Sequence, residues 1–429
     1  MLDSRPVWCN TFDMKLSEEL KWRGFINQTT YSDLSQLDSL HGQTFYMGFD
    51  ASADSQTIGN LAAMMFVKTF LRHNRPGILV AGGSTSLIGD PGGKDTERPL
   101  QDEKTIASNI KNAEQQIKNI LRGHKFKLVN NLEWTKNLNV LHFLRDIGKH
   151  FSMTPLIQRD YIAKRIGQDG SGISYAEFSY TVLQGYDYLH LHDKHGVTLQ
   201  LGGSDQWGNC LSGVELIRRV RGKEVDVITM NLVINQATNK KFGKTEEGAI
   251  WLDAKKTTPT QFYQFWINAD DKGVESYLKI YTELGRSEID AIMDKHQKNP
   301  GERYAQQCLA AEATTLVHGE DNAGRAAIVS DVLTSKVPVE SISSETARAI
   351  SGEIPSITVK AGDSLIDILV RVGLAMSNTE ARRLLSSGAI YLNGQPTSSE
   401  QLDGEILDGR YALLRRGKAY KDSALLELG

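Results

Sequence analysis

The chain has 429 residues, 40% of them hydrophobic, and a formal net charge of −3. These values are typical of a globular protein with two or three domains, and the charge excludes a uniformly basic nucleic-acid binder while allowing a local basic patch. Every apolar run is shorter than the roughly 18 residues that a membrane span requires, and the first residues carry no signal-peptide core. We therefore expect a cytoplasmic protein that does not associate with membranes.

The three cysteines, Cys9, Cys210 and Cys308, lie far apart in the chain. Their spacing fits neither a metal site nor a disulfide framework. We therefore expect reduced thiols and no metal held by the protein.

Apolar segments alternate with helical segments from residue 44 to about residue 230. After a short helix expected within 14–24, strands are predicted at 45–49, 77–81, 127–129, 197–201 and 225–230. Strands joined by helical crossovers are typical of an α/β fold with a doubly wound parallel sheet, whose ligands bind at the carboxyl ends of the strands. The candidate binding loops are therefore those that follow these strands, namely 48–60, 82–98 and 202–209.

The loop 48–60 joins a predicted strand to a helix that begins near Gly59. N–H groups in the first turn of a helix have no carbonyl partners, and the helix dipole adds positive charge there, so a phosphate is a natural occupant. Small polar residues also suit the start of any helix. From this stretch alone, a phosphate site and an ordinary loop are equally good interpretations.

The helix predicted over 179–189 carries Tyr180, Gln184 and Asp187 on one face, because residues three and four apart lie together on a helix. A buried polar face needs hydrogen-bond partners, and a small polar ligand would supply them. The alternative is that this face contacts solvent.

Two further loops carry groups suited to a charged substrate. Gly202 begins the loop 202–209, where glycines let the backbone approach a ligand and the groups that follow can bind ribose hydroxyls and a carboxylate. In the loop 89–98, Asp90 can accept hydrogen bonds from an amine, while Lys94 and Arg98 can neutralise anions.

A basic loop follows the last predicted strand of the sheet. Its lysines Lys241 and Lys244 flank Gly243, which gives the backbone freedom to move. Such a loop could close over a triphosphate, or it could be a solvated surface loop. Its position after a strand favours the first interpretation, because it then faces the same edge of the sheet as 48–60.

The sequence pattern changes after residue 250. Helical periodicity over 259–335 predicts a helical domain, and residues 336–356 are rich in serine, proline and glutamate, as expected of a linker. The last module combines two short helices with strands at 389–393 and 411–414 and an Asn-Gly hairpin turn. We therefore predict four parts: 1–250, 251–335, 336–356 and 357–429.

The last module carries a basic cluster interleaved with tyrosines. Phosphates explain such clustering better than solvent does, because a solvated surface mixes charges of both signs. We expect RNA to contact Arg382, Arg383, Arg415, Arg416 and Lys418.

Six motifs occur in a fixed order: YMGFDASADS, TIGN, LIGDPGGK, EFSYTVLQGYD, QLGGSDQWGN and KFGKT. With the C-terminal module, they make the chain resemble the bacterial tyrosyl-tRNA synthetases over essentially its whole length. The resemblance implies a Rossmann-like α/β catalytic domain, a helical domain and a small α+β S4-like RNA-binding domain. It also implies a tyrosine–tRNA ligase that forms tyrosyl-adenylate from tyrosine and ATP with Mg²⁺, without a tightly bound cofactor, and then esterifies tRNA(Tyr).

The same resemblance assigns roles to individual residues. Tyrosine would be bound by Tyr46, Asp90, Tyr180, Gln184, Asp187 and Gln206. ATP and the adenylate would be bound by Gly48, Asp50, Ser52, Gly59, Lys94, Arg98, Gly202, Asp205, Lys241 and Lys244. Catalysis would depend on Thr57, Asn60, Lys241, Lys244 and Thr245. The apolar segment 138–153 would form a subunit contact, which implies a homodimer.

The chain departs from this family where the first long helix begins. The family motif His-Ile-Gly-His is replaced by Thr57, Ile58, Gly59 and Asn60. Losing one transition-state donor typically costs about 3–4 kcal/mol, so we expect slower activation. A paralogue that binds RNA or tyrosine without aminoacylation is the alternative, whereas a Rossmann oxidoreductase is excluded because no Gly-x-Gly-x-x-Gly follows the first strand.

Overall fold

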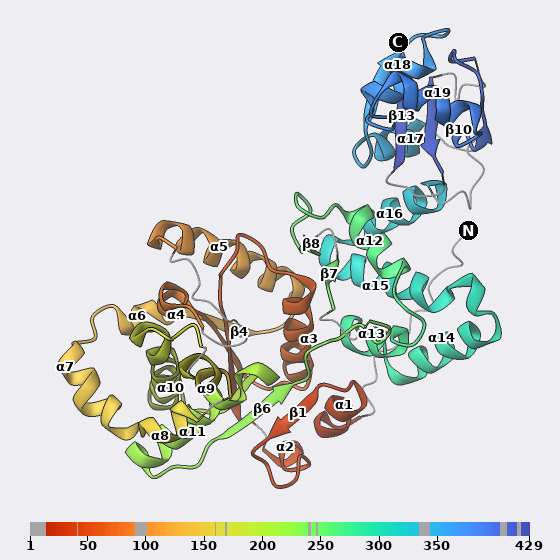
Figure 1. The fold of residues 1–429 in the computed structure, drawn as a ribbon. Coiled ribbons are helices and arrows are strands. Elements are labelled where there is room, and N and C mark those ends of the chain that lie inside the picture. The colour runs from red at the N-terminus through yellow and green to blue at the C-terminus, as the bar shows by residue number, and fades with distance from the viewer. Residues whose placement is uncertain are drawn as a thin grey trace. The chain divides into compact units, whose positions relative to one another are not determined.

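The computed structural model describes residues 14–40, 42–90, 101–158, 160–167, 170–238, 242–245, 248–333, 344–403, 410–417 and 422–429. Contacts divide the chain into two units: one comprises 1–253 and 269–305, and the other comprises 254–268 and 306–429. Each unit is built around one large sheet (Figure 1).

The sheet of the first unit has the strand order β1-β6-β5-β2-β3-β4. Its strands are β1 (Ile26–Thr29), β2 (Thr44–Phe49), β3 (Gly77–Ala81), β4 (Phe126–Asn130), β5 (Val197–Gly203) and β6 (Asp226–Met230). The predicted parallel, doubly wound arrangement is confirmed for β2 to β6. The prediction missed β1, which pairs antiparallel with β6 and makes the sheet mixed. This strand is short and largely polar, so no apolar pattern marks it.

Helices cover both faces of this sheet, as expected of a Rossmann-like fold (Figure 1). Phe45 of β2 contacts Phe70 of α3 (Ile58–Arg72) on one face, with 5.2 Å between ring centroids. The next residue, Tyr46, contacts Tyr188 of α10 (Tyr175–His195) on the other face at 5.0 Å. Adjacent strand residues point to opposite faces, so β2 is buried between these helices. The adjacent helices are α4 (Gly83–Ile88), α5 (Glu103–Ile120), α6 (Leu132–Thr135) and α11 (Trp207–Arg221).

A buried ionic cluster fixes α3 to α1 (Leu16–Trp22) and to α13 (Val274–Tyr281). Glu19 on α1 accepts hydrogen bonds from Arg23, Arg72 and His73. Arg23 also donates to the carbonyl of Lys279 at the end of α13. Burial raises the pKa of Glu19, but the hydrogen bond from His73 and the charges of Arg72 and Arg23 bring it down to about 2. The carboxylate therefore stays ionised and holds the three helices together.

The region expected to form the helical domain, 251–335, contributes to both units. Helices α13 and α14 (Arg286–Lys298) belong to the first unit, because α13 packs against α3. Helices α12 (Pro259–Ile267) and α16 (Glu320–Leu333) belong to the second, while α15 (Tyr304–His318) spans the boundary. The stretch expected to be a linker, 336–356, contains α17 (Ser344–Ser351).

The sheet of the second unit has the order β11-β10-β12-β13-β9. Alternating residues of β12 face opposite sides: Leu413 packs with α16 and α17, and Leu414 packs with α18 and α19. The predicted α+β fold is confirmed, but β9 and β13, which pair in parallel, were not predicted. The elements are β9 (Ser356–Val359), α18 (Leu365–Arg371), α19 (Asn378–Ser386), β10 (Ile390–Leu392), β11 (Gln395–Pro396), β12 (Tyr411–Arg416) and β13 (Ser423–Leu428).

The apolar segment predicted as a helix over 138–153 is helical but irregular. It consists of α7 (Val140–His142), a π-helical turn over Phe143–Ile147 and a 3-10 turn over Gly148–His150. Its side chains at Val140 and Leu141 are 64% and 71% exposed. Within the described ranges, no helix combines the length and the hydrophobicity needed to span a bilayer.

Candidate active site

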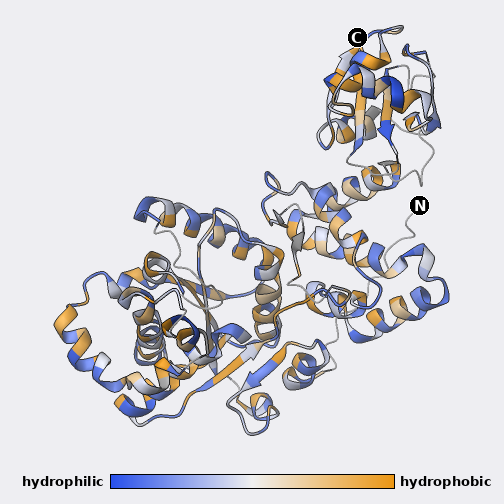
Figure 2. Cartoon of the chain, viewed as in Figure 1, coloured by the Kyte–Doolittle hydropathy of each residue, from blue (hydrophilic) through white to orange (hydrophobic). Residues whose placement is uncertain are grey.

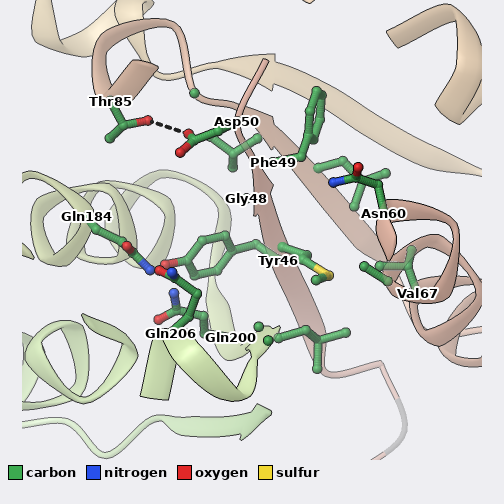
Figure 3. Close-up of a pocket in the computed structure, with 18 of the residues that line it drawn as sticks. Tyr46, Gly48, Phe49, Asp50, Asn60, Val67, Thr85, Gln184, Gln200 and Gln206 are labelled. Atoms are coloured by element: carbon green, nitrogen blue, oxygen red, sulfur yellow. Dashed lines mark hydrogen bonds between the residues drawn. The ribbon is translucent and has the colours of Figure 1, made fainter. Parts of the chain in front are cut away.

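A cavity of about 340 Å³ opens at the carboxyl ends of β2, β3 and β5 (Figure 3). Its walls include Asp50 after β2, Gly82 after β3 and Gly203 at the end of β5. Parallel strands bring their carboxyl ends to one edge, so three loops far apart in the sequence meet here. The predicted site residues that line it are Tyr46, Gly48, Asp50, Ser52, Asn60, Asp90, Tyr180, Gln184, Asp187, Gly202, Asp205 and Gln206.

The buried end of the cavity is lined by Tyr46, Asn131 and Asp187, and Trp134 contacts Asp187 without lining the cavity itself. Asp187 accepts a hydrogen bond from Asn131 Nδ2 at 2.9 Å and another from Trp134 Nε1 at 2.7 Å. Both carboxylate oxygens are therefore engaged by neutral donors. The Trp134 ring is itself held by stacking on His190, with 4.5 Å between centroids.

The electrostatics of the buried end favour a neutral hydroxyl as ligand. Burial raises the pKa of Asp187, the hydrogen bonds from Asn131 and Trp134 lower it, and the resulting pKa is about 7. The Tyr46 hydroxyl is buried and has no hydrogen-bond partner among the described residues, and burial raises its pKa well above the usual value. A ligand hydroxyl that donates to Asp187 and pairs with Tyr46 would satisfy both groups.

A second carboxylate stands where β2 ends. Asp50 accepts hydrogen bonds from Tyr180 at 3.1 Å and from Thr85 at 3.2 Å, the latter drawn in Figure 3. A side chain at Gly82 would lie 2.3 Å from Asp50 Oδ1, so this contact requires glycine. Burial, followed by the charges of Asp50 and Asp90, raises the pKa of Tyr180. Several carboxylates around one cavity attract a cationic group such as an ammonium ion.

Four glutamines, Gln56, Gln184, Gln200 and Gln206, line the same cavity, and Figure 3 shows the last three around it. The Oε1 atoms of Gln184 and Gln200 are buried and have no partner among the described residues. Gln206 Nε2 donates to Asp90 Oδ2 at 2.6 Å. Buried amides without partners are costly, so this wall is suited to a polar ligand.

The rim of the cavity is formed by Gly48, Ser52, Asn60 and Asp205, all of them exposed. Asn60 Oδ1 accepts hydrogen bonds from the backbone N–H and the hydroxyl of Thr57, each at 2.9 Å. Because both donors bind the amide oxygen, the amide nitrogen of Asn60 is the atom that can donate a hydrogen bond to a ligand. Thr57 does not line the cavity, and neither does Gly59.

The basic loop is tied to the start of α3. The carbonyl of Gly243 accepts from the N–H of Ile250, whose own carbonyl accepts from the N–H of Ile58. Gly243 has φ +87°, and a side chain there would lie 2.4 Å from Ile58. The described part of this loop therefore ends beside the helix start that carries Thr57 and Asn60.

Several predicted residues lie outside what the structure describes. Lys94, Arg98, Lys241 and Lys418 are outside the described residues. Lys244 and Thr245 form strand β7, which pairs with β8 (Gly248–Ala249), but their side chains are not described.

Sequence reasoning missed Asn131, Trp134, Thr85 and Gln200 as parts of the site. One signal was present for Asn131 and Trp134, because they directly follow predicted strand 127–129 and so lie at the carboxyl edge of the sheet. Gln200 lies inside β5, where nothing in the local pattern distinguishes it.

The arginines of the C-terminal module fall into two groups. Arg382 and Arg383 on α19 have side chains that are 61% and 76% exposed. Arg416 instead donates to the carbonyl of Leu374 at 3.0 Å and to Asp422 at 3.3 Å. Arg415 lies over the ring of Tyr391, 5.2 Å from its centroid.

Two protein families match this chain. The family described as tRNA synthetases class I (W and Y) matches residues 41–333. The family described as the tyrosine–tRNA ligase SYY-like C-terminal domain matches residues 345–421.

Individual relatives extend over nearly all of the chain. A tyrosine–tRNA ligase from Geobacillus kaustophilus is 41% identical over 94% of this chain and 98% of its own length. A tyrosine–tRNA ligase from Neisseria meningitidis is 39% identical over 96% and 99%. A C-terminally truncated mitochondrial tyrosyl-tRNA synthetase from Aspergillus nidulans superimposes with a TM-score of 0.66 and 29% identity, covering 73% of this chain and 92% of that one.

Proposed function

Because the chain belongs to the class I tRNA synthetases of the tryptophan and tyrosine group, we propose that it is a tyrosine–tRNA ligase. It would activate tyrosine with ATP and transfer the tyrosyl group to the terminal adenosine of tRNA(Tyr). The observation that carries the proposal is the buried end of the cavity, where Asp187 and the unpaired hydroxyl of Tyr46 meet. An indole or an unsubstituted phenyl ring would leave both groups without the partner that a phenol offers.

We infer that tyrosine binds with its ring in the buried end of the cavity. The phenol hydroxyl would donate to Asp187 and pair with Tyr46, and the ammonium group would face Asp90 together with Tyr180 and Gln184. Gln206, which is bonded to Asp90, would lie beside the carboxylate. The carboxylate would then point toward the rim, where ATP is expected.

Activation requires no nucleophile from the protein. A carboxylate oxygen of tyrosine attacks the α-phosphorus of ATP, a phosphorus–oxygen bond forms, and pyrophosphate leaves with the electron pair of the bond that breaks. The enzyme contributes position and positive charge. Asn60 would donate to the nucleotide, Gly48, Gly59 and Gly202 would let it approach the backbone, and Asp50, Ser52 and Asp205 would contact the adenylate or its ribose. The charge on the leaving group would be neutralised by Lys94, Arg98, Lys241 and Lys244, with Thr245 beside them.

Magnesium would enter this site with ATP. Within the described ranges, no group of three His, Cys, Asp or Glu side chains is arranged to hold a metal ion. Mg²⁺ usually keeps several waters and is held by one or two protein carboxylates together with the phosphates of the substrate. The rim carboxylate of Asp205 is therefore compatible with a magnesium complex of ATP. The ion would supply positive charge to the phosphates.

In the second step, a ribose hydroxyl of the terminal adenosine attacks the tyrosyl carbonyl carbon, the ester bond forms and AMP leaves. The exposed arginines Arg382 and Arg383 support RNA binding by the C-terminal module, with Arg415 and Lys418 as further contacts. Arg416 is engaged with Leu374 and Asp422, which favours a structural role. Replacing Arg382 and Arg383 by alanine should weaken tRNA binding and flatten its salt dependence, while adenylate formation stays unchanged.

We also propose that the protein acts in the cytoplasm as a homodimer. Figure 2 shows hydrophobic residues along α7, and the exposed apolar side chains between residues 140 and 166 are Val140, Leu141, Leu144, Met153, Ile157 and Ile166. A monomer rarely leaves such a patch open to water, and a second copy of the chain would bury it. Sedimentation at micromolar concentration should give a dimer, and Leu141→Asp should shift it to a monomer.

Tyrosine-dependent exchange of pyrophosphate into ATP, followed by transfer to tRNA, tests the function directly. Exchange with tyrosine and not with phenylalanine or tryptophan is the expected result. The alternative is a paralogue that binds tyrosine or RNA without aminoacylation. It is motivated by Thr57 and Asn60, which replace the two histidines of the family motif. A folded protein that binds tyrosine and tRNA but catalyses no exchange would favour that paralogue.

A further inference from the structure

A chain of hydrogen bonds runs from the interior of α10 to the cavity. Thr181 Oγ1 lies 2.7 Å from Asn209 Oδ1. Asn209 Nδ2 lies 3.1 Å from Gln206 Oε1, and Gln206 Nε2 lies 2.6 Å from Asp90 Oδ2. We call these residues, Thr181, Asn209, Gln206 and Asp90, the amide chain. Thr181 and Asn209 are 2% and 4% exposed, and neither lines the cavity.

The carboxylate at one end fixes the direction of every bond in the amide chain. An ionised Asp90 can only accept, so the atom of Gln206 that faces it must be the amide nitrogen. Gln206 Oε1 must then accept from the amide nitrogen of Asn209. The Asn209 oxygen consequently faces Thr181, whose hydroxyl has to donate. No other assignment of the two amides satisfies all three contacts.

We propose that Thr181 and Asn209 are positioning residues that hold the Gln206 amide in one orientation for the carboxylate of the substrate. This inference rests on the proposed function and extends it. Gln206 Nε2 has two hydrogens, one of which is given to Asp90. The second lies on the cavity side and donates to the tyrosine carboxylate, the group that attacks ATP.

The opposite orientation of Gln206 would repel both neighbours. Its oxygen would face Asp90 and its remaining lone pairs would face the negative substrate carboxylate. Asn209 opposes the same rotation, because its amide nitrogen donates to Gln206 Oε1, and the Thr181 hydroxyl in turn holds Asn209 in that orientation. The Thr181 hydroxyl therefore acts together with Asp90 to keep the Gln206 amide in one orientation.

The first test removes that hydroxyl without changing the size of the side chain. Thr181→Val should raise the Kd for tyrosine about tenfold, because Asn209 Oδ1 loses the hydrogen bond from Thr181 and the Gln206 amide is held less firmly. Thr181→Ser keeps the hydroxyl and should stay within about threefold of the unaltered enzyme. The matched control is Thr69→Val: Thr69 is also buried in a helix, but it donates to the carbonyl of Met65 and does not line the cavity.

Binding of tyramine distinguishes a positioning role from a general loss of structure in the cavity. Tyramine has the phenol and the ammonium group of tyrosine but no carboxylate. Equilibrium dialysis of Thr181→Val should show weaker binding of tyrosine with the Kd for tyramine changed by less than about twofold. The control Thr69→Val should leave both unchanged. Equal losses for tyrosine and tyramine, or no loss for either, would overturn the inference.

A second variant keeps the test decisive if Thr181→Val folds poorly. Asn209→Asp has the same shape, but its oxygen would face Gln206 Oε1 and force the amide to turn. It should weaken tyrosine binding more than Thr181→Val does and again spare tyramine. If the unaltered enzyme binds and activates tyrosine while both variants match it, the inference alone fails. If the unaltered enzyme neither binds nor activates tyrosine, the proposed function fails as well.

Discussion

The two ends of the cavity are built on different principles. At the buried end, Asp187 and Tyr46 are shielded from water, and each oxygen of the Asp187 carboxylate already has a fixed donor. At the rim, Gly48, Ser52, Asn60 and Asp205 are exposed, and Asn60 is fixed by its neighbour Thr57.

We expect this difference to separate the selection of the substrate from its reaction. A dry, preorganised carboxylate penalises a ligand that lacks its hydroxyl, because the penalty cannot be relieved by water. An open rim can admit a triphosphate and release pyrophosphate, but each of its hydrogen bonds to the nucleotide is weaker because water competes for it. Substrate choice should therefore be sensitive to the buried end and the rate of activation to the rim.

The largest effect is expected for Asp187→Asn. The amide oxygen could accept from only one of Asn131 and Trp134, and the NH2 group would face the other donor, so kcat/KM for tyrosine in pyrophosphate exchange should fall at least about 10²-fold. Preference for tyrosine over phenylalanine should fall with it. A variant that kept normal preference would show that selection does not reside at the buried end.

The next effect concerns the rim. Asn60→Ala should lower kcat for exchange about tenfold while leaving the Kd for tyrosine unchanged, because it removes a donor to the nucleotide. Thr57→Val should lower kcat less, since it only frees the Asn60 amide to turn. The double variant should resemble Asn60→Ala, because the two residues act as one unit. Additive losses would mean that Thr57 contacts the nucleotide itself.

A smaller effect at neutral pH is expected for Trp134→Phe. The pKa of Asp187 is about 7, so kcat/KM for tyrosine should fall as the pH drops through 7 and the carboxylate is protonated. Removing the Trp134 donor takes away an interaction that lowers this pKa. The acid limb of the profile should therefore move to higher pH, and activity near pH 9 should be nearly normal. An unmoved limb would contradict the assignment.

The smallest effect on activity is expected for Glu19→Gln. Glu19 contacts Arg72 at the end of α3 and does not line the cavity. The pKa of Glu19 is lowered from 4.5 to about 2, so its contribution is present above pH 4.5 and is lost as the pH falls toward 2. The unaltered protein should lose stability to urea over that range, by about 2–3 kcal/mol. The Glu19→Gln variant should be less stable to urea at pH 7, and its stability should change less between pH 4.5 and pH 2. Its kinetics should be normal as long as it is folded.

Local patterns predicted what depends on local spacing. The strands β2 to β6 follow from apolar segments, and the shared face of Tyr180, Gln184 and Asp187 follows from helical periodicity; all three residues line the cavity. The partners of Asp187 depend on the placement of β4 beside β3, which brings Asn131 to α10. That contact lies 56 residues away in sequence, and no local pattern encodes it.

The pairing of strands at the edges of the sheets could not be predicted from local patterns either. Strand β1 joins β6 across about two hundred residues, and β9 joins β13 in parallel near the end of the chain. An edge strand presents unpaired N–H and C=O groups to which any extended segment can pair, however far away it lies in the sequence. The sequence of β1 alone, Ile26–Thr29, carries too little alternation to reveal it.

The bond between the start of α3 and the segment after the basic loop has a consequence for synthesis of the protein. Ile58 N–H donates to the carbonyl of Ile250, and Leu252 N–H donates to the carbonyl of Gln56. A nascent chain that ends before residue 250 already contains Tyr46, Asn131, Trp134 and Asp187, but it lacks the segment 250–252 that holds the helix start. On the ribosome, which delivers the amino-terminal part first, the buried end of the cavity can therefore form before the start of α3 is held in place.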